Sequence, residues 1–126
     1  MGIKKLMMIH EVYSKEIVKV LVPFTDNLNV PNEYGETPIY WAANYGYTKI
    51  VKILAPLTDN PNAQDYYGKT PIHLAARTGR TEIVQILVPL TDKPNAPDIA
   101  GKTPIYWAEM KGYREIVKTV GSLKEN

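Results

Sequence analysis

The sequence repeats itself with a period of 33 residues. Gly35, Gly68 and Gly101 stand 33 positions apart, and a Thr-Pro pair follows each of them after one residue. Residues 35–67 and residues 68–100 are identical at 20 of 33 positions. A period of this length is typical of arrays in which each unit buries its apolar face only against its neighbours. The chain is therefore expected to be a stack of similar units.

The first half of each unit predicts a turn followed by a short helix. Gly68 suits a turn that needs a positive φ. Thr70 is expected to cap the helix and Pro71 to occupy its first position, where no backbone donor is lost. The predicted helix spans about 71–78 and ends at Gly79.

The second half of each unit predicts another short helix. Thr81 is expected to cap this helix. Its apolar positions form one stripe at helical spacing: Ile83, Val84, Ile86 and Leu87. Helices this short are unstable alone, so their stability is expected to come from stacking between units.

The composition is that of an ordinary globular domain. The chain has 126 residues, 44% of them hydrophobic and 22% charged, with a net charge of +2 and no cysteine. We expect one domain covering residues 1–126, without a signal peptide or a membrane-spanning helix. The charge balance is too weak to indicate nucleic-acid binding. The absence of cysteine fits a reducing compartment such as the cytoplasm, or an engineered chain.

Several motifs resemble the ankyrin repeat. Residues 68–76 read Gly-x-Thr-Pro-Ile-His-Leu-Ala-Ala, followed by Gly79, by Glu-Ile-Val from residue 82 and by Asn-Ala-x-Asp from residue 95. The resemblance implies an all-α, ankyrin-like helical solenoid of helix-turn-helix repeats. We expect four repeats, two of them complete and two divergent at the ends: 1–34, 35–67, 68–100 and 101–126.

The two end units depart from the pattern in ways that suit capping units with one wet face. Residues 17–21 keep the register of residues 50–54, but Lys4 and Lys5 stand where Thr-Pro is expected. In the last unit, Glu109 replaces an alanine and Thr119 replaces an isoleucine.

Prolines and one histidine mark a second departure. The family usually continues the second helix for another turn, whereas here Pro23, Pro56 and Pro89 follow it. Because proline disfavours helical geometry just before itself, we expect the helix to kink or tighten there. The histidine of the family's Thr-Pro-Leu-His motif survives only as His73. Tyrosines stand in its place at positions 40 and 106, so the turn-bracing bonds of that histidine cannot be assumed there.

Residues for catalysis or for metal binding are scarce. His10 and His73 lie in different units, and no cysteine accompanies them, so no catalytic triad is indicated. Four aspartates recur at the repeat period and are interpreted as turn formers rather than as metal ligands: Asp59, Asp65, Asp92 and Asp98. We therefore expect a non-enzymatic protein with no cofactor and no metal.

The aromatic residues are the strongest functional signal, because tyrosine and tryptophan are enriched in binding hot spots. The chain has 9 Tyr and 2 Trp but a single Phe. One set is expected at turn tips or at the exposed end of the first helix, where it favours recognition: Tyr34, Tyr45, Tyr66 and Tyr67. A second set is expected to fill gaps between units: Tyr40, Tyr47, Tyr106 and Tyr113.

The resemblance implies that a protein partner binds to a surface formed by turn tips and first helices, which we call the concave face. The candidate contact residues are Tyr34, Glu36, Trp41, Asn44, Tyr45, Tyr66, Tyr67, Lys69, Arg77, Thr78, Lys102, Trp107, Met110 and Lys111. Lys69, Arg77, Arg80 and Lys102 form a mildly basic strip, which suits an acidic partner or is simply solvated surface.

Two functional hypotheses follow. The first is a non-catalytic protein–protein interaction module that binds a partner through the concave face, without nucleic acid or membrane. The alternative is a designed or consensus scaffold with no natural partner, which the close identity between units favours. A monomer is expected, and the aromatic face leaves a homodimer as the other assembly.

Overall fold

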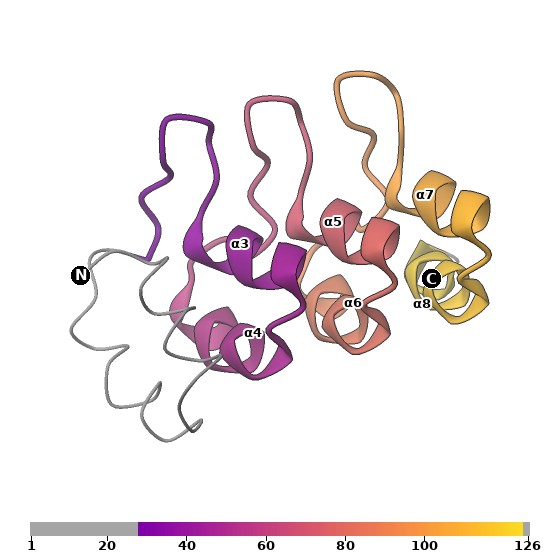
Figure 1. Cartoon of the computed structure of the whole chain (residues 1–126), viewed down its shortest axis with the longest axis horizontal. Helices are drawn as coiled ribbons and strands as arrows, with labels where there is room; N and C mark the ends of the chain where they lie inside the picture. The colour runs from indigo at the N-terminus through magenta and orange to yellow at the C-terminus, as the bar shows by residue number, and fades with distance from the viewer. Residues whose placement is uncertain (1–27, 125–126) are drawn as a thin grey trace.

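A computed structural model describes residues 28–124 as a row of helix pairs (Figure 1). The helices are α3 (Pro38–Tyr45), α4 (Thr48–Leu54), α5 (Pro71–Thr78), α6 (Thr81–Leu87), α7 (Pro104–Lys111) and α8 (Arg114–Lys124), with 3₁₀ turns η2 (Ala55–Leu57) and η3 (Val88–Leu90). The predicted all-helical solenoid is confirmed in this range. Lys4, Lys5, His10 and Pro23, with most of the predicted first unit, lie outside the described residues.

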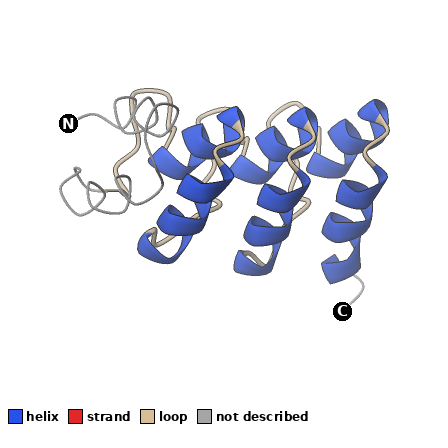
Figure 2. Ribbon diagram, turned by 60° about the horizontal axis from the view of Figure 1, so that its bottom comes forward, coloured by secondary structure: helices blue, strands red, loops and turns tan. Residues whose placement is uncertain are grey.

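The helices form two layers. The first helices of the units, α3, α5 and α7, lie side by side, and the second helices α4, α6 and α8 form the other layer (Figures 1 and 2). Long turns project away from the start of each first helix (Figure 1). Between residues 28 and 124, no helix is both long and apolar enough to cross a membrane.

The core lies between the two layers and between neighbouring units. Ile39 and Ile72 at the start of the first helices are 0% and 1% exposed. Alanines follow on the same helices and are fully buried: Ala42, Ala43, Ala75 and Ala76. Their small side chains allow close packing of adjacent first helices, while the second helices contribute larger side chains: Ile50, Val51, Leu54, Ile83, Val84 and Leu87.

The predicted start of the first helix is confirmed at Thr70. Its hydroxyl oxygen accepts a hydrogen bond of 3.3 Å from the backbone N–H of His73. In the reciprocal bond, the Nδ1 atom of the His73 ring accepts the Thr70 N–H at 3.0 Å, which completes a capping box. Gly79 ends the helix with φ 77°, in the left-handed region where glycine is unstrained.

The predicted cap of the second helix is wrong. Thr81 is the first residue of α6, and Arg80 stands at the N-cap position without a side-chain hydrogen bond to the helix. Only Gly79 and Arg80 separate α5 from α6, so Arg80, the residue after the glycine, occupies the N-cap position. Thr81 therefore lies inside the helix rather than before it.

The predicted tightening at the helix-two prolines is confirmed. The α-helix gives way to a 3₁₀ turn over Ala55–Leu57 and again over Val88–Leu90, each containing the proline. Thr58 then donates its hydroxyl to the Leu54 carbonyl at 2.7 Å, which satisfies an oxygen left free at the helix end. No proline interrupts α8, which accordingly runs for 11 residues.

The helix starts provide a matched pair of substitutions. Replacing Thr70 with Val removes a cap and is expected to lower the free energy of unfolding by about 1 kcal/mol. The Thr37 hydroxyl is buried and has no hydrogen-bond partner among the described residues, so Thr37→Val should be neutral or slightly stabilising. Urea denaturation of both variants checks this, and equal losses of stability would contradict the different capping of the two helices.

Candidate interaction surface

One side chain at the base of each turn holds the turn in shape. The Asp65 carboxylate accepts the backbone N–H of Tyr67 at 2.8 Å and that of Lys69 at 2.9 Å. Asp98 makes the equivalent two bonds in the next turn, and Asn32 makes them in the preceding one. The three turns thus have the same internal scaffold, which leaves little freedom to the residues at their tips.

Neighbouring tips are joined to one another by backbone hydrogen bonds. The Tyr66 N–H donates to the Tyr34 carbonyl at 3.1 Å, and the Ile99 N–H donates to the Tyr67 carbonyl at 2.9 Å. The Tyr66 ring also lies over Gly35, where an added Cβ would approach the ring to 2.7 Å. The tips therefore form one continuous edge rather than three independent loops.

Neighbouring helix pairs are linked at a deeper level by a buried hydrogen bond from Tyr40. Its hydroxyl donates to the second carboxylate oxygen of Asp65 at 2.6 Å, across the boundary between the α3–α4 pair and the turn that leads into α5. Burial and the neighbouring Asp65 carboxylate both raise the pKa of the Tyr40 hydroxyl, so it stays protonated as a donor. Tyr40 thus braces the turn in place of the family's histidine, although by a different bond.

The next boundary uses a different pair of groups. The Lys69 ammonium lies 3.2 Å from the second carboxylate oxygen of Asp98, whose side chain is only 1% exposed. Burial acts to raise the pKa of Asp98, but the hydrogen bonds from the Lys102 N–H and from Lys69 outweigh it and lower the pKa below its usual value. Lys69 is thereby committed to the turn, which removes most of its charge from the surface.

His73 completes this second boundary. Because its Nδ1 accepts the Thr70 N–H, the proton lies on Nε2, which donates to the Lys102 carbonyl at 3.0 Å. The side chain is 1% exposed, and burial lowers its pKa. The neutral ring is therefore a structural element, with both nitrogens used.

Aromatic side chains cluster at two places on the first helices. On α3, Tyr45 stacks between Trp41 at 5.4 Å and Tyr47 at 5.8 Å, measured between ring centroids. On α7, Tyr106 and Trp107 meet edge to face at 5.3 Å. The first cluster contacts the core through Trp41 and Tyr47, whereas the second lies nearer the surface.

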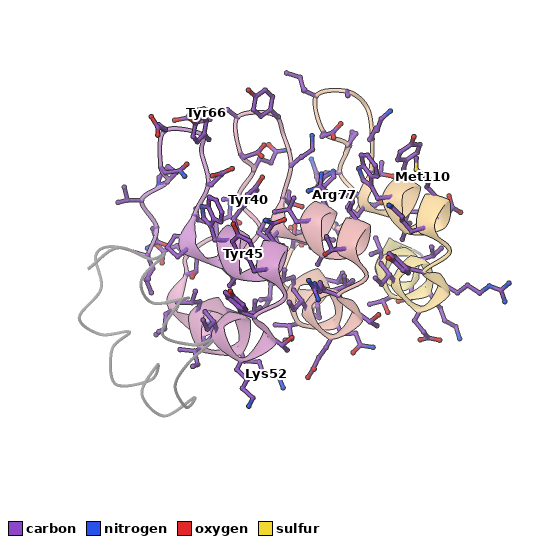
Figure 3. The ribbon with its side chains drawn as sticks, in the orientation of Figure 1. Tyr40, Tyr45, Lys52, Tyr66, Arg77 and Met110 are labelled. Atoms are coloured by element: carbon purple, nitrogen blue, oxygen red, sulfur yellow. The ribbon has the colours of Figure 1, made fainter. Side chains whose placement is uncertain are left out.

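Cations lie over the second cluster. The Arg77 guanidinium is 5.9 Å from the Trp107 ring centroid, and the Lys102 ammonium is 4.8 Å from the Tyr106 ring centroid. Both distances are within the range of cation–π attraction. Arg77 reaches from α5 toward α7 (Figure 3) and so connects two units on the same face.

The structure places the predicted contact residues on turns and first helices, with different exposures. Tyr34, Tyr45, Tyr66, Tyr67, Met110 and Lys111 are exposed, and Glu36, Trp41, Asn44, Lys69, Arg77, Thr78, Lys102 and Trp107 are half-buried. Two of the half-buried groups are already engaged locally. Glu36 accepts from the Asn32 amide at 2.9 Å, and Thr78 donates to the Leu74 carbonyl at 2.7 Å.

Sequence reasoning misassigned one side chain and missed another. Tyr106, expected to fill a gap between units, is 38% exposed and packs edge to face against Trp107 on its own helix. Ile99, at a turn tip, is 78% exposed and was not among the candidates. The alignment of the repeats could have found it, since Ile99 occupies the position of Tyr66.

No group of His, Asp or Glu in the described range could hold a metal ion. Asp65, Asp98 and His73 are all used in turn and boundary bonds, as described above. The surface offers aromatic rings, a few cations and backbone groups, and aromatic side chains are enriched in binding hot spots.

Comparison with known proteins identifies the repeat. Residues 4–65 and, again, residues 57–124 match a family model described as ankyrin repeats in three copies. No curated protein matches the sequence.

The neutral state of His73 predicts a pH-dependent stability. An unfolded histidine binds a proton near pH 6.5. Because folding lowers the pKa of His73, the unfolded chain binds more protons as the pH falls below that value, and the free energy of unfolding decreases. Urea melts at about pH 7.5 and about pH 5 should show this loss.

His10→Gln is the matched control, since it removes the other histidine of the chain. We expect it to keep the pH-dependence, whereas His73→Gln should flatten it. An unchanged slope in His73→Gln would show that His73 does not titrate as described.

Proposed function

The chain belongs to the ankyrin repeat family, and from that premise we propose that it is a non-catalytic module that binds a protein partner through its concave face. Ankyrin repeats are generally protein–protein interaction modules and are typically not catalytic. The concave face as the site, and the residues that act there, are our proposal for this chain.

The distribution of exposed apolar side chains carries the proposal. Ten large apolar side chains are exposed in the described range, and seven of them lie on turn tips or first helices: Tyr34, Tyr45, Tyr66, Tyr67, Ile99, Tyr106 and Met110. The other three are Val30, Leu57 and Leu90. Exposed apolar groups gathered on one face are a mark of an interaction surface.

The construction of the turns supports the same conclusion. Binding is weakened by the entropy lost when flexible side chains and loops become ordered. Here the tips are already held by Asp65, by Asp98 and by the bonds between neighbouring tips. Tyrosine adds large contact area with few rotatable bonds, so the tip residues lose little freedom when a partner binds.

Two substitutions on this face test the proposal. Tyr45→Ala together with Tyr67→Ala is expected to weaken partner binding by roughly thirtyfold or more, which corresponds to about 2 kcal/mol. Loss of the Tyr45 stack should cost about 1 kcal/mol of stability, and Tyr67 is 59% exposed, so the variant should stay folded. Leu57→Ala with Leu90→Ala is the matched control, because both leucines are exposed but follow the second helices.

Affinity capture from a cell extract, with each protein immobilised at equal density, provides the measurement. A partner retained by the wild type and the leucine control but lost by the tyrosine variant supports the proposal. A partner retained equally by all three would place binding elsewhere, and capture by none would favour the scaffold hypothesis. Sedimentation of the same proteins tests whether the partner is a second copy, since a dimer through this face should dissociate in the tyrosine variant.

A further inference from the structure

Three cations on the concave face have no acidic partner. Lys52 and Lys69 form ion pairs with Glu82 and Asp98, at 2.8 and 3.2 Å. Within the described part of the chain, by contrast, no carboxylate pairs with the three cations that lie around α7: Arg77, Lys102 and Lys111. These are the positive charges left for an external anion on this face.

The three cations alternate with the exposed side chains of α7. Lys102 lies over Tyr106 and Arg77 lies over Trp107, while the two rings touch each other. Met110 and Lys111 are three and four residues after Trp107, so they share its helix face. We call this set the α7 patch: Arg77, Lys102, Tyr106, Trp107, Met110 and Lys111.

The one acidic residue of α7 lies at the edge of the patch. Glu109 lines a hollow at the end of the array together with Gly112, Tyr113 and Arg114. It is three residues after Tyr106 and two after Trp107, so it is a neighbour of Tyr106 but lies on a different side of the helix from Trp107. The α7 patch therefore keeps a net positive charge, with three cations and one carboxylate at its edge.

The chemistry of the patch suits carboxylates. The Arg77 guanidinium lies 5.9 Å from the Trp107 ring centroid, and its planar fork of N–H groups matches a carboxylate in a bidentate arrangement. The aromatic rings and Met110 offer apolar contact to the side chains between the charges. A carboxylate partner would thus meet both charge and apolar area.

The spacing of the cations sets the shape of the partner. Lys102 precedes α7 and Lys111 ends it, and this eight-residue helix is about 12 Å long at 1.5 Å per residue. Side chains on one face of an extended chain recur every second residue, so the first, third and fifth residues span about 13 Å. Three carboxylates at alternate positions therefore extend over the length of α7, along which the three cations lie.

Opposite charge at the other end of the face limits the length of the acidic segment. Glu33 and Glu36 lie on the turn of the unit that contains α3, next to exposed Tyr34. A long polyanion such as a nucleic acid would be repelled there. A short acidic segment on α7, continued by apolar residues toward Trp41 and Tyr45, avoids this repulsion.

We infer that the α7 patch binds a short, extended acidic segment of the protein partner, with carboxylates on alternate residues paired to Lys102, Arg77 and Lys111. The inference rests on the proposed function, because it assigns the partner chemistry of the same face. The inference also fixes the orientation of the bound partner, whose acidic part lies at α7 and whose apolar part lies at α3.

NMR titration of the full chain tests this assignment. The probe is a short synthetic peptide with three glutamates at every second position, and the comparison peptides have the glutamates consecutive or replaced by glutamine. We expect the alternating peptide to bind most tightly, the glutamine peptide at least about tenfold more weakly, and added salt to weaken the interaction. The indole N–H signal of Trp107 should shift, while that of Trp41 should not.

Charge-removing variants complete the test. Arg77→Gln should weaken binding of the alternating peptide about tenfold, and Arg77→Gln/Lys102→Gln/Lys111→Gln should abolish it. Lys49→Gln/Arg114→Gln/Lys118→Gln removes the same charge from exposed positions on second helices and should bind normally. Equal binding of all three peptides, or equal loss in both triple variants, would overturn the inference. Tighter binding of a single-stranded oligothymidylate, abolished in the same patch variant, would also overturn it in favour of nucleic acid.

The same triple variant in the capture assay separates this inference from the proposed function. A partner lost by the patch variant and by Tyr45→Ala/Tyr67→Ala supports both. A partner retained by the patch variant but lost by the tyrosine variant overturns the acidic-segment inference and leaves the concave-face proposal standing. A partner retained by both variants overturns the concave-face proposal itself.

Discussion

A buried carboxylate at the base of the turns that lead into α5 and α7 is the interaction on which the rest of the array depends. One oxygen of Asp65 locks its own turn by accepting two backbone N–H groups, and the other accepts the Tyr40 hydroxyl of the preceding helix pair. Asp98 repeats this division of labour with Lys69 as the partner. Because a buried carboxylate left unpaired is strongly destabilising, the shape of each turn and the docking of neighbouring units are coupled.

The two described boundaries solve the same problem with different residues. Where the turn ends with Glu36, no ammonium is available at that position, and the Tyr40 hydroxyl reaches the carboxylate. Where the turn ends with Lys69, its ammonium pairs with the carboxylate, and the shorter His73 ring caps its own helix and contacts a backbone carbonyl. The Thr37 hydroxyl has no partner among the described residues, whereas Thr103, which also precedes a tyrosine by three residues, accepts the Tyr106 N–H at 3.0 Å.

The turn tips can carry different side chains on one common scaffold. The core, made of alanines and branched residues between the layers, is independent of the turn tips. The tips are fixed by hydrogen bonds to backbone groups, so their side chains are free to differ between units. The exposed side chains at the tips can therefore be substituted at little cost in stability: Tyr34, Tyr66, Tyr67 and Ile99.

The sequence by itself determined the repeat, the helix boundaries at Thr-Pro and glycine, and the tightening at Pro56 and Pro89, because these depend on local backbone geometry. Only the tertiary structure decided which side chains meet across unit boundaries. In the structure, Lys69 pairs with buried Asp98, Tyr106 and Ile99 are exposed, and Arg77 lies over the Trp107 ring of the next unit. The repeat period predicts that units stack. The contacts of each side chain depend on its length and on which groups of the neighbouring unit lie within its reach.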